Sequence, residues 1–163
     1  MSVMIEAADQ LADITNLHLL LVGKNMEQYA GLIENNRMRE RIHVAGYRYD
    51  APELIVASDL LIQPSISGEG LPRAVMEAMG YGTPAIITTT GGGKEVVTDG
   101  VNGKVVPIND PSAIARAVRE LHQQPEKIEE MSRQCKLAIA ERYSIAQTTI
   151  AFENYFQSLL ADD

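Results

Sequence analysis

Short runs of apolar residues alternate with helical patterns along most of this chain, and this alternation restricts the fold more than any other feature. Continuous apolar runs predict strands at 17–22, 42–45, 59–63, 85–88 and 103–106. Apolar residues at helical spacing predict helices at 2–14, 26–35, 51–57, 71–79, 111–122, 125–143 and 145–160. Strands that alternate with helices form a parallel sheet, and strands that are apolar throughout are buried on both faces.

The expected fold class is therefore α/β. A Rossmann-like domain of three layers with a parallel sheet would span 1–163 as a single unit and end in helices at about 125–160. A length of 163 residues suits one domain. Asp50 is an expected helix N-cap, and Pro72 is expected in the first turn of the next helix. The chain opens on a helix, whereas a doubly wound domain normally starts with a strand, so the first strand is expected to be missing.

Composition narrows the classes of function. The net charge of -8 and the absence of Trp argue against nucleic-acid binding, which usually needs a basic face. Cys135 is the single cysteine, so no internal disulfide forms and a cytoplasmic location is expected. No apolar run reaches the roughly 18–20 residues that span a bilayer, and the first ten residues lack a signal pattern. Peripheral membrane contact stays open.

In doubly wound sheets, ligands bind beyond the carboxyl ends of the strands. Glycine and charged residues gather at those ends here, at 23–24, 46–48, 64–71 and 89–95. The stretch from 64 to 84 is the richest, because Gly68 and Gly70 let the backbone approach a ligand closely. A helix expected to begin near Leu71 would offer free N–H groups there. This arrangement predicts a diphosphate site.

Two carboxylates flank that predicted helix start. Glu69 precedes it and Glu77 lies inside the helix, and eight helical residues would separate them by roughly 12 Å. This distance is too long for a paired acid and base acting on one bond, because glycosidase carboxylates lie about 5–9.5 Å apart. Two ends of one extended ligand suit the spacing better, since each carboxylate can accept hydrogen bonds from sugar hydroxyls.

Five sequence blocks make the prediction more specific. The pattern E-x7-E lies within EGLPRAVMEAMGYGTPAI, and LLLVG, IHVAGYRYD, ASDLLIQPS and TTTGGGKEVVTDGVNGKVVP accompany it. Together and in this order they resemble the family 4 glycosyltransferases of the GT-B fold, over approximately residues 3–160. The resemblance implies the C-terminal, nucleotide-sugar-binding half of a two-domain enzyme that transfers a hexose to a hydroxyl acceptor and retains the anomeric configuration.

The resemblance also implies a role for each matching position. Glu69, the expected catalytic residue, would hold the hydroxyls of the donor sugar, and Glu77 would hold the ribose. The backbone N–H groups of Gly70 and Leu71 would meet the phosphates or the sugar.

Four further positions complete the implied donor site. Tyr47 and Arg48 would border the base, and Gly23 and Lys24 would line the floor of the cleft. No metal ion and no cofactor are expected, because this fold needs no metal for the diphosphate.

One departure from the family pattern limits the expected activity. The family places an Arg and a Lys on the first strand and loop of this domain, and this chain lacks both. The acceptor-binding N-terminal domain is absent too. The nearby cations are Lys24, Arg48, Arg73 and Lys94. Weak donor binding and no transfer by the chain alone are therefore expected, with the N-terminal domain as the partner and a homodimer as an alternative.

Competing interpretations remain at this point. The chain could be a non-catalytic nucleotide-sugar-binding or dimerisation module, or part of a GT-B nucleotide-sugar epimerase, although no His lies near Glu69 or Glu77 in sequence. Glu77 could simply pair with Arg73 on a helix surface. The three glycines at 91–93 could form a turn or contact a phosphate. Cys135 is expected to pack in a helix interface.

Overall fold

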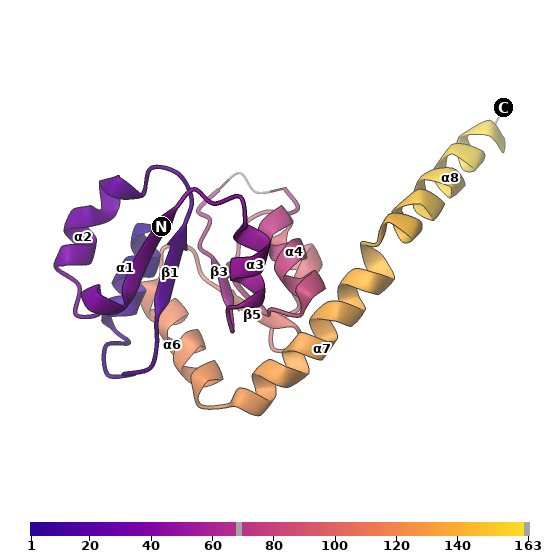
Figure 1. The fold of residues 1–163 in the computed structure, drawn as a ribbon. Helices are drawn as coiled ribbons and strands as arrows, with labels where there is room; N and C mark the ends of the chain where they lie inside the picture. The colour runs from indigo at the N-terminus through magenta and orange to yellow at the C-terminus, as the bar shows by residue number, and fades with distance from the viewer. Residues whose placement is uncertain (68–69, 162–163) are drawn as a thin grey trace.

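The computed structural model describes residues 1–67 and 70–161 of the chain, and these form an α/β domain with a long C-terminal helical extension (Figure 1). The strands are β1 (Leu19–Val22), β2 (Ile42–Gly46), β3 (Leu61–Gln63), β4 (Ala85–Thr88) and β5 (Gly103–Val106). The helices are α1 (Ser2–Asp9), α2 (Ala30–Glu34), α3 (Ala51–Val56), α4 (Arg73–Tyr81), α5 (Gly93–Val96), α6 (Pro111–His122), α7 (Pro125–Arg142) and α8 (Ile145–Ala161), with short 3₁₀ turns η1 (Met26–Tyr29) and η2 (Arg39–Arg41).

All strand pairs are parallel, as predicted from the sequence. β1 pairs with β2, with Leu19 opposite Ile42. β4 lies between β3 and β5, with Ala85 opposite Leu61 on one side and opposite Gly103 on the other. Among the described residues these make two sheets, β1-β2 and β3-β4-β5, rather than one continuous sheet.

Helices cover β4 on both faces, which confirms the predicted three layers. Successive strand residues point to opposite faces, and the buried residues of β4 divide accordingly. Ile86 packs in the cluster that contains α1, α6 and β1. Ala85 and Ile87 pack in the cluster formed with α4 and α7. A strand that is buried on both faces needs to be apolar throughout, which explains the AIIT run.

The second cluster contains the predicted packing cysteine. Cys135 on α7 is fully buried, and its thiol donates to the carbonyl of Asn102 at 3.0 Å. Burial raises the pKa of the Cys135 thiol to about 12. The thiol therefore stays protonated at neutral pH and acts as a small packing group, as the sequence predicts.

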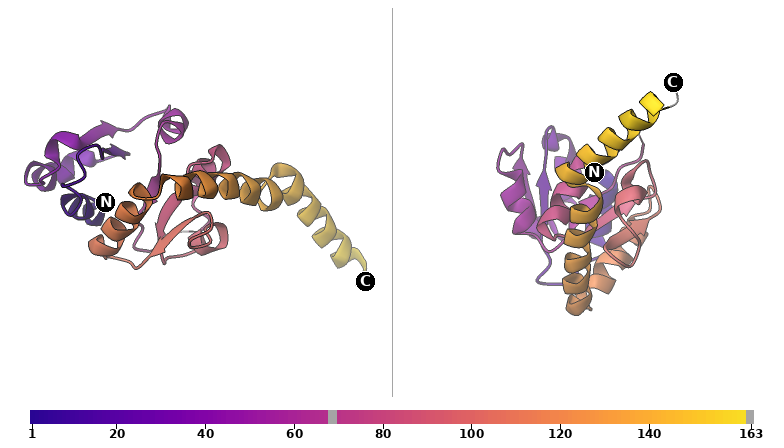
Figure 2. Two further views of the ribbon diagram at one scale, coloured as in Figure 1. Left: turned by 90° about the horizontal axis from the view of Figure 1, so that it is seen from below. Right: turned by 90° about the vertical axis from the view of Figure 1, so that its right-hand side faces the viewer.

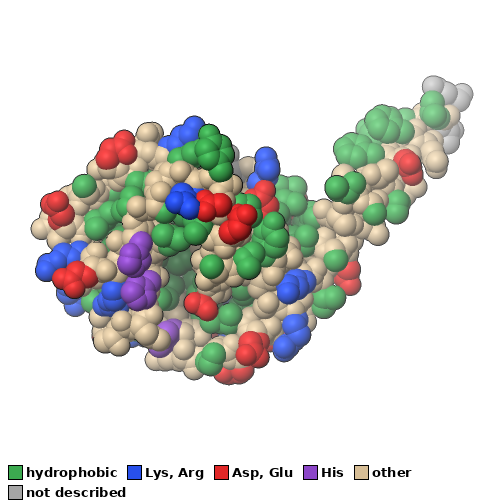
Figure 3. All heavy atoms as spheres, viewed as in Figure 1, with side chains coloured by type: hydrophobic (Ala, Val, Ile, Leu, Met, Phe, Trp, Pro, Cys, Tyr) green, Lys and Arg blue, Asp and Glu red, His purple; other side chains and the backbone are tan. Residues whose placement is uncertain are grey.

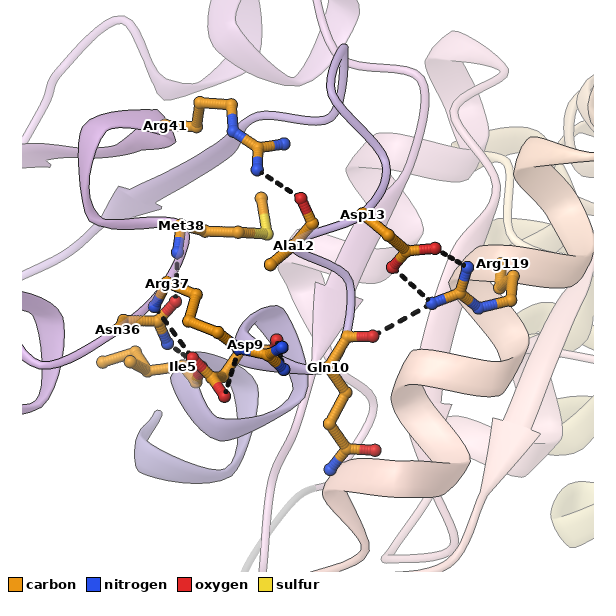
Figure 4. A network of polar contacts seen from close by, with 10 residues as sticks. All are labelled: Ile5, Asp9, Gln10, Ala12, Asp13, Asn36, Arg37, Met38, Arg41 and Arg119. Atoms are coloured by element: carbon orange, nitrogen blue, oxygen red, sulfur yellow. Dashed lines mark hydrogen bonds and ion pairs between the residues drawn. The ribbon is translucent and has the colours of Figure 1, made fainter.

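Helix α1 ends at Asp9, five residues before the predicted end. Arginines from distant elements capture the carbonyl groups that follow the helix (Figure 4). Arg119 of α6 donates to the carbonyl of Gln10 at 3.0 Å, and Arg41 donates to the carbonyl of Ala12 at 2.8 Å. The backbone can leave the helix because these charged donors satisfy its free carbonyls.

One predicted helix start, that of α4, differs from the structure, and another, that of α3 after Asp50, is confirmed. Helix α4 begins at Arg73, and Pro72 precedes it as the N-cap residue with an extended backbone, so Pro72 and Leu71 lie outside the first turn. Asp50 stands at the N-cap of α3 but makes no side-chain capping bond. Its carboxylate instead accepts a hydrogen bond from Nε of Arg48 at 2.7 Å, because a charged partner two residues away competes with the backbone.

Helix α8 projects away from the domain in each view (Figures 1 and 2). Every residue from Ile145 to Leu160 is exposed. Apolar side chains line this helix (Figure 3), and the largest of them are Ile145, Ile150, Phe152, Tyr155, Phe156, Leu159 and Leu160. In the part of the chain that the structure describes, no helix has the length and apolar character to cross a bilayer.

Candidate functional site

The residues predicted to bind a ligand lie at the carboxyl ends of the strands, at the upper edge of the molecule in Figure 1. They form two groups. One group follows β1 and β2, and the other lies between β3, α4 and β4. Glu69 and Gly68 lie outside the described residues, so the predicted catalytic carboxylate has no structural description.

The first group is joined by a backbone hydrogen bond between the ends of β1 and β2. The N–H of Gly23 donates to the carbonyl of Gly46 at 2.8 Å, and both glycines have positive φ angles of 148° and 67°. Side chains other than glycine rarely adopt such angles, which explains why the chain has glycine at both strand ends. The predicted Gly23 and Gly46 positions are thus adjacent in space.

The loops that follow β1 and β2 bring a cation onto an aromatic ring. Nζ of Lys24 lies 5.0 Å from the ring centroid of Tyr47. Tyr49, which the sequence analysis did not select, packs edge-on against Tyr47 with ring centroids 5.1 Å apart. Tyr47 is 56% exposed and Tyr49 is 91% exposed. Two accessible tyrosine rings of this kind can present a flat apolar face to a planar base.

The guanidinium of Arg48 is engaged by Asp50 rather than free to contact a ligand beside Lys24 and Tyr47. Its guanidinium binds both carboxylate oxygens of Asp50, and the bond from Nε is 2.7 Å long. This pairing holds the pKa of Asp50 below its usual range and raises the pKa of Arg48. The positive charge of Arg48 is therefore already compensated within the protein, which reduces its value as a phosphate partner.

The second group depends on a close contact between two loops. A Cβ atom placed on Gly92 would lie 2.8 Å from the carbonyl oxygen of Gly70 and 3.3 Å from the backbone nitrogen of Leu71. The glycine triplet therefore supports the backbone of the segment that the sequence predicts to bind phosphate. At Gly93 a Cβ would meet Cδ1 of Ile87 at 2.8 Å. Close packing, rather than flexibility, accounts for the glycines at positions 92 and 93.

The glycine triplet also leads into helix α5, which was not predicted. α5 is a single turn whose first residue is Gly93, and the glycine triplet at 91–93 favoured a loop instead. The pair Val96 and Val97 was the one available signal, since both side chains are buried against α4 and α7. Two apolar neighbours alone cannot distinguish a short helix from a strand.

A small cavity lies beside this loop contact. Its volume is about 10 Å³, close to what one water molecule needs. It is lined by Gln63, Ser65, Pro72, Ile87, Thr88, Thr90 and Gly93. The hydroxyl of Thr88 donates to the carbonyl of Ser65 at 2.5 Å, which ties the end of β4 to the segment after β3. A nucleotide-sized ligand is too large for this cavity and would occupy the open surface above it.

Glu77 lies on α4 and pairs with Arg73. The separation between its Oε1 and Nη2 of Arg73 is 3.2 Å, and the side chains are 44% and 89% exposed, respectively. The surface pair considered from sequence therefore exists. Such an exposed pair contributes only about 0.2–0.5 kcal/mol to helix stability. This small contribution does not by itself explain why the chain has a carboxylate at this position.

The three histidines lie away from these two groups. His18 precedes β1, and its Nδ1 lies 3.0 Å from Nε2 of His43 on the neighbouring strand. His122 contacts the side chain of Asn16 at 3.1 Å. His18 and Asn16 precede β1, so these contacts lie toward its amino end, opposite the site. Within the described ranges, no three His, Cys, Asp or Glu side chains gather as metal ligands would.

Comparison with known proteins places these features in a family. The model of the family described as "Glycosyl transferases group 1" matches residues 1–138. The EpsD protein of Bacillus subtilis is 30% identical over 93% of this chain and 41% of its own length. The N-acetyl-alpha-D-glucosaminyl L-malate synthase of Bacillus anthracis is 26% identical over 98% of this chain and 42% of its own. The chain thus spans less than half the length of these relatives.

Solved structures show the same fold at lower identity. Anabaena HepE, solved in complex with UDP, superimposes with a TM-score of 0.87 at 22% identity, over 96% of this chain and 44% of HepE. The C-terminal domain of LpcC, a group 1 glycosyl transferase of Francisella tularensis, gives a TM-score of 0.79 at 19% identity over 88% of this chain and 79% of that domain. These neighbours are GT-B glycosyltransferases, and the fold is that of their C-terminal domain. By sequence and by fold, this chain belongs to the group 1 glycosyltransferases.

Proposed function

We propose that this chain is the donor-binding half of a retaining, family 4 glycosyltransferase that moves a hexose from a nucleoside diphosphate sugar to a hydroxyl acceptor. The observation that carries the proposal is the contact of Gly92 with the Gly70–Leu71 backbone, in a chain whose family is established. This contact holds two glycine-rich loops together at the carboxyl edge, beside the start of α4, where the positive end of a helix favours a diphosphate. Support also comes from HepE, which was solved with UDP and with UDP-glucose.

Each of the two groups of residues binds a different part of the donor. Tyr47 borders the base, and Gly23 and Lys24 form the floor beneath it. Glu77 accepts hydrogen bonds from the ribose hydroxyls, since its carboxylate offers acceptors only. Backbone N–H groups of Gly70 and Leu71 meet the phosphates.

Glu69, in the same proposal, is the catalytic residue and holds the donor sugar. Arg48 contributes to the border of the base through its planar guanidinium rather than through free charge, since Asp50 compensates that charge. The proposal includes no metal ion and no cofactor.

Positive charge is scarce at this site. Arg73 is engaged by Glu77, and Arg48 is engaged by Asp50. Lys24 lies against Tyr47, which leaves Lys94 on α5 as a further nearby cation. A leaving diphosphate needs compensation of its developing charge. The chain alone is therefore proposed to bind a donor weakly and to transfer no sugar.

The acceptor-binding half is the proposed partner. Support comes from α8, whose apolar side chains Phe152, Tyr155 and Phe156 are each 58–59% exposed and have no covering element among the described residues. Such a surface is typical of an interaction site. Residues 1–163 would form one domain of the complete enzyme, in the cytoplasm, with peripheral membrane association of that enzyme when its acceptor is a lipid.

A non-catalytic binding or dimerisation module is the second candidate, and the same exposed α8 favours it. A homodimer would cover that surface without any second domain. An epimerase gains no support, because it would need a His in the cleft and the contacts of His18, His43 and His122 lie at the opposite end of β1.

Calorimetric titration with UDP, GDP and ADP, each alone and as a sugar conjugate, tests donor binding. We expect saturable binding of one nucleotide, with a dissociation constant of about millimolar, which corresponds to about 4 kcal/mol. Glu77→Ala should abolish this binding and leave Tm nearly unchanged. Arg73→Ala is the matched control, because it breaks the same ion pair but keeps the carboxylate, so it should retain binding. Unchanged binding in Glu77→Ala, or equal loss in both variants, would contradict the assigned role.

A further inference from the structure

Two exposed histidines meet across the sheet formed by β1 and β2, toward the amino end of β1. Nδ1 of His18 lies 3.0 Å from Nε2 of His43, the ring planes differ by 21°, and the ring centroids are 5.2 Å apart. Because the nitrogens are much closer than the centroids, the rings meet edge to edge through these nitrogens. Both residues are exposed, and Figure 3 shows two His side chains touching at the surface. Small solutes can therefore reach this nitrogen pair.

The pairing of the two strands places both rings on one face. Leu19 of β1 lies opposite Ile42 of β2, and both side chains pack in the core cluster that contains α1 and α6. Successive residues of a strand point to opposite faces of the sheet. The neighbours of this core pair, His18 and His43, therefore point away from the core and toward each other.

Arg41 fixes the spacing of the histidine pair from the backbone. It stands two residues before His43, and its guanidinium donates to backbone carbonyls that include those of Ala12 at 2.8 Å and Leu17 at 3.3 Å. Leu17 directly precedes His18, so one side chain ties the segment before β1 to the strand that carries His43. The guanidinium charge would oppose a second cation nearby, but these carbonyl dipoles partly offset it.

The distance between the two nitrogens suits a shared metal ion. Imidazole nitrogens bind Zn²⁺ at about 2.0–2.1 Å, and two such bonds at angles between square-planar and tetrahedral place the nitrogens about 2.8–3.4 Å apart. The observed 3.0 Å lies within this range. Without a metal, one ring donates a hydrogen bond to the other. Moving that proton to the other nitrogen of the donating ring frees both facing lone pairs, so a metal ion needs no large movement of the rings.

We propose that His18 and His43 form a two-ligand binding site for a late first-row divalent cation, with Zn²⁺ as the expected ion. Imidazole suits Zn²⁺, Cu²⁺ and Ni²⁺, whereas Mg²⁺ and Ca²⁺ take oxygen ligands. Within the described ranges no third His, Cys, Asp or Glu joins the pair. Solvent, or a donor group of another molecule, completes the coordination. The bound ion joins the segment before β1 to β2 and stabilises this side of the domain.

Titration of the untagged chain with ZnCl₂ at neutral pH, followed by calorimetry, tests the inference. We expect one Zn²⁺ per chain with a dissociation constant of about 10–100 μM, because two protein ligands replace the four of a structural zinc site. MgCl₂ should give no binding. His18→Gln and His43→Gln should each weaken Zn²⁺ binding at least about tenfold. His122→Gln is the matched control, because this exposed histidine contacts only the Asn16 amide among its printed partners and should leave binding unchanged.

Two further measurements do not depend on the strength of the heat signal. Zn²⁺ should shift the imidazole NMR signals of His18 and His43 but not those of His122. It should also raise Tm in the original chain and in His122→Gln but not in the other two variants. The inference is overturned by no binding at about millimolar Zn²⁺, by equal binding in the original chain and either His18→Gln or His43→Gln, or by equal loss in His122→Gln. No nucleotide is present, so failure here is distinguishable from failure of donor binding.

Discussion

Gly92 shows how one residue without a side chain can let two loops approach each other closely. The peptide between Gly70 and Leu71 lies so close to Gly92 that a methyl group there would be 2.8 Å from a carbonyl oxygen. The φ angle of Gly92 is an ordinary -73°, so its backbone conformation does not require glycine. The requirement is steric and comes from a segment far away in the sequence.

Gly92→Ala should therefore weaken donor binding at least about tenfold, because the Gly70–Leu71 backbone must move away. The matched control is Gly31→Ala in α2, where a Cβ would meet nothing within 4 Å. That control should bind normally and gain up to about 1 kcal/mol in stability, since alanine favours helix. Titration of both variants with the same nucleotide checks the prediction. Normal binding by Gly92→Ala would show that this loop contact does not position the phosphate site.

At the scale of elements, the position of α1 depends on an ion pair across the chain. Asp13, just after α1, accepts hydrogen bonds from both terminal nitrogens of Arg119 on α6, at 2.6 and 2.8 Å (Figure 4). These bonds lower the pKa of Asp13 from 3.8 to about 2. The neighbouring Asp9 pairs with Arg37, whose backbone N–H lowers its pKa as well. The Asp9–Arg37 and Asp13–Arg119 pairs together hold α1 against the core.

Asp13→Asn should lower Tm by a few degrees at neutral pH, where the Asp13 carboxylate is charged. Because the folded pKa is depressed, the contribution of Asp13 is fully present above an unfolded pKa of 3.8 and is lost as the pH falls through about 2. Thermal unfolding of both proteins at a series of pH values checks this. The two Tm curves should converge below about pH 2, the folded pKa of Asp13. A difference that stays constant with pH would mean that the contact acts through packing and not through charge.

At the scale of the whole molecule, α8 projects away from the domain. All of its described residues are exposed, whereas α6 and α7 contribute buried residues such as Leu121 and Met131. The rings of Phe152 and Phe156 stack on each other with centroids 6.4 Å apart instead of packing on the domain. The domain core therefore forms without α8, and the helix is available to another partner.

Deletion of residues 145–163 should leave the Tm of the domain nearly unchanged, because no buried contact is lost. It should also reduce self-association at high protein concentration, since the exposed apolar side chains of α8 are removed. Sedimentation velocity and thermal unfolding measure the two effects. The double variant Phe152→Ser and Phe156→Ser in the full chain should reproduce the loss of self-association. A strongly lowered Tm after deletion would show that α8 packs on the domain.

Much of the fold was predictable because its signals are local. The run AIIT marked β4 at the residues where it occurs, since a strand buried on both faces must be apolar throughout. The run GKVV likewise marked the bounds of β5, although that strand is only partly buried. The bounds of α6 were predicted correctly at 111–122 from apolar spacing, and the structure shows that the Asp110 carboxylate caps the helix by accepting a hydrogen bond from the backbone N–H of Ala113 at 2.8 Å. Local capping chemistry and apolar periodicity suffice for such elements.

The sequence by itself determined the parallel α/β class and the glycosyltransferase family, and it predicted the edge at which we propose that a donor binds, because these depend on period, order and glycine placement. Tertiary structure alone decided the rest. Arg119 and Arg41 end α1 from distant elements, Lys24 meets Tyr47 across two loops, and Gly92 supports the Gly70 backbone. Each of these contacts joins residues separated by 20 or more positions, and only the folded chain brings such residues within the few ångströms over which hydrogen bonds and packing act.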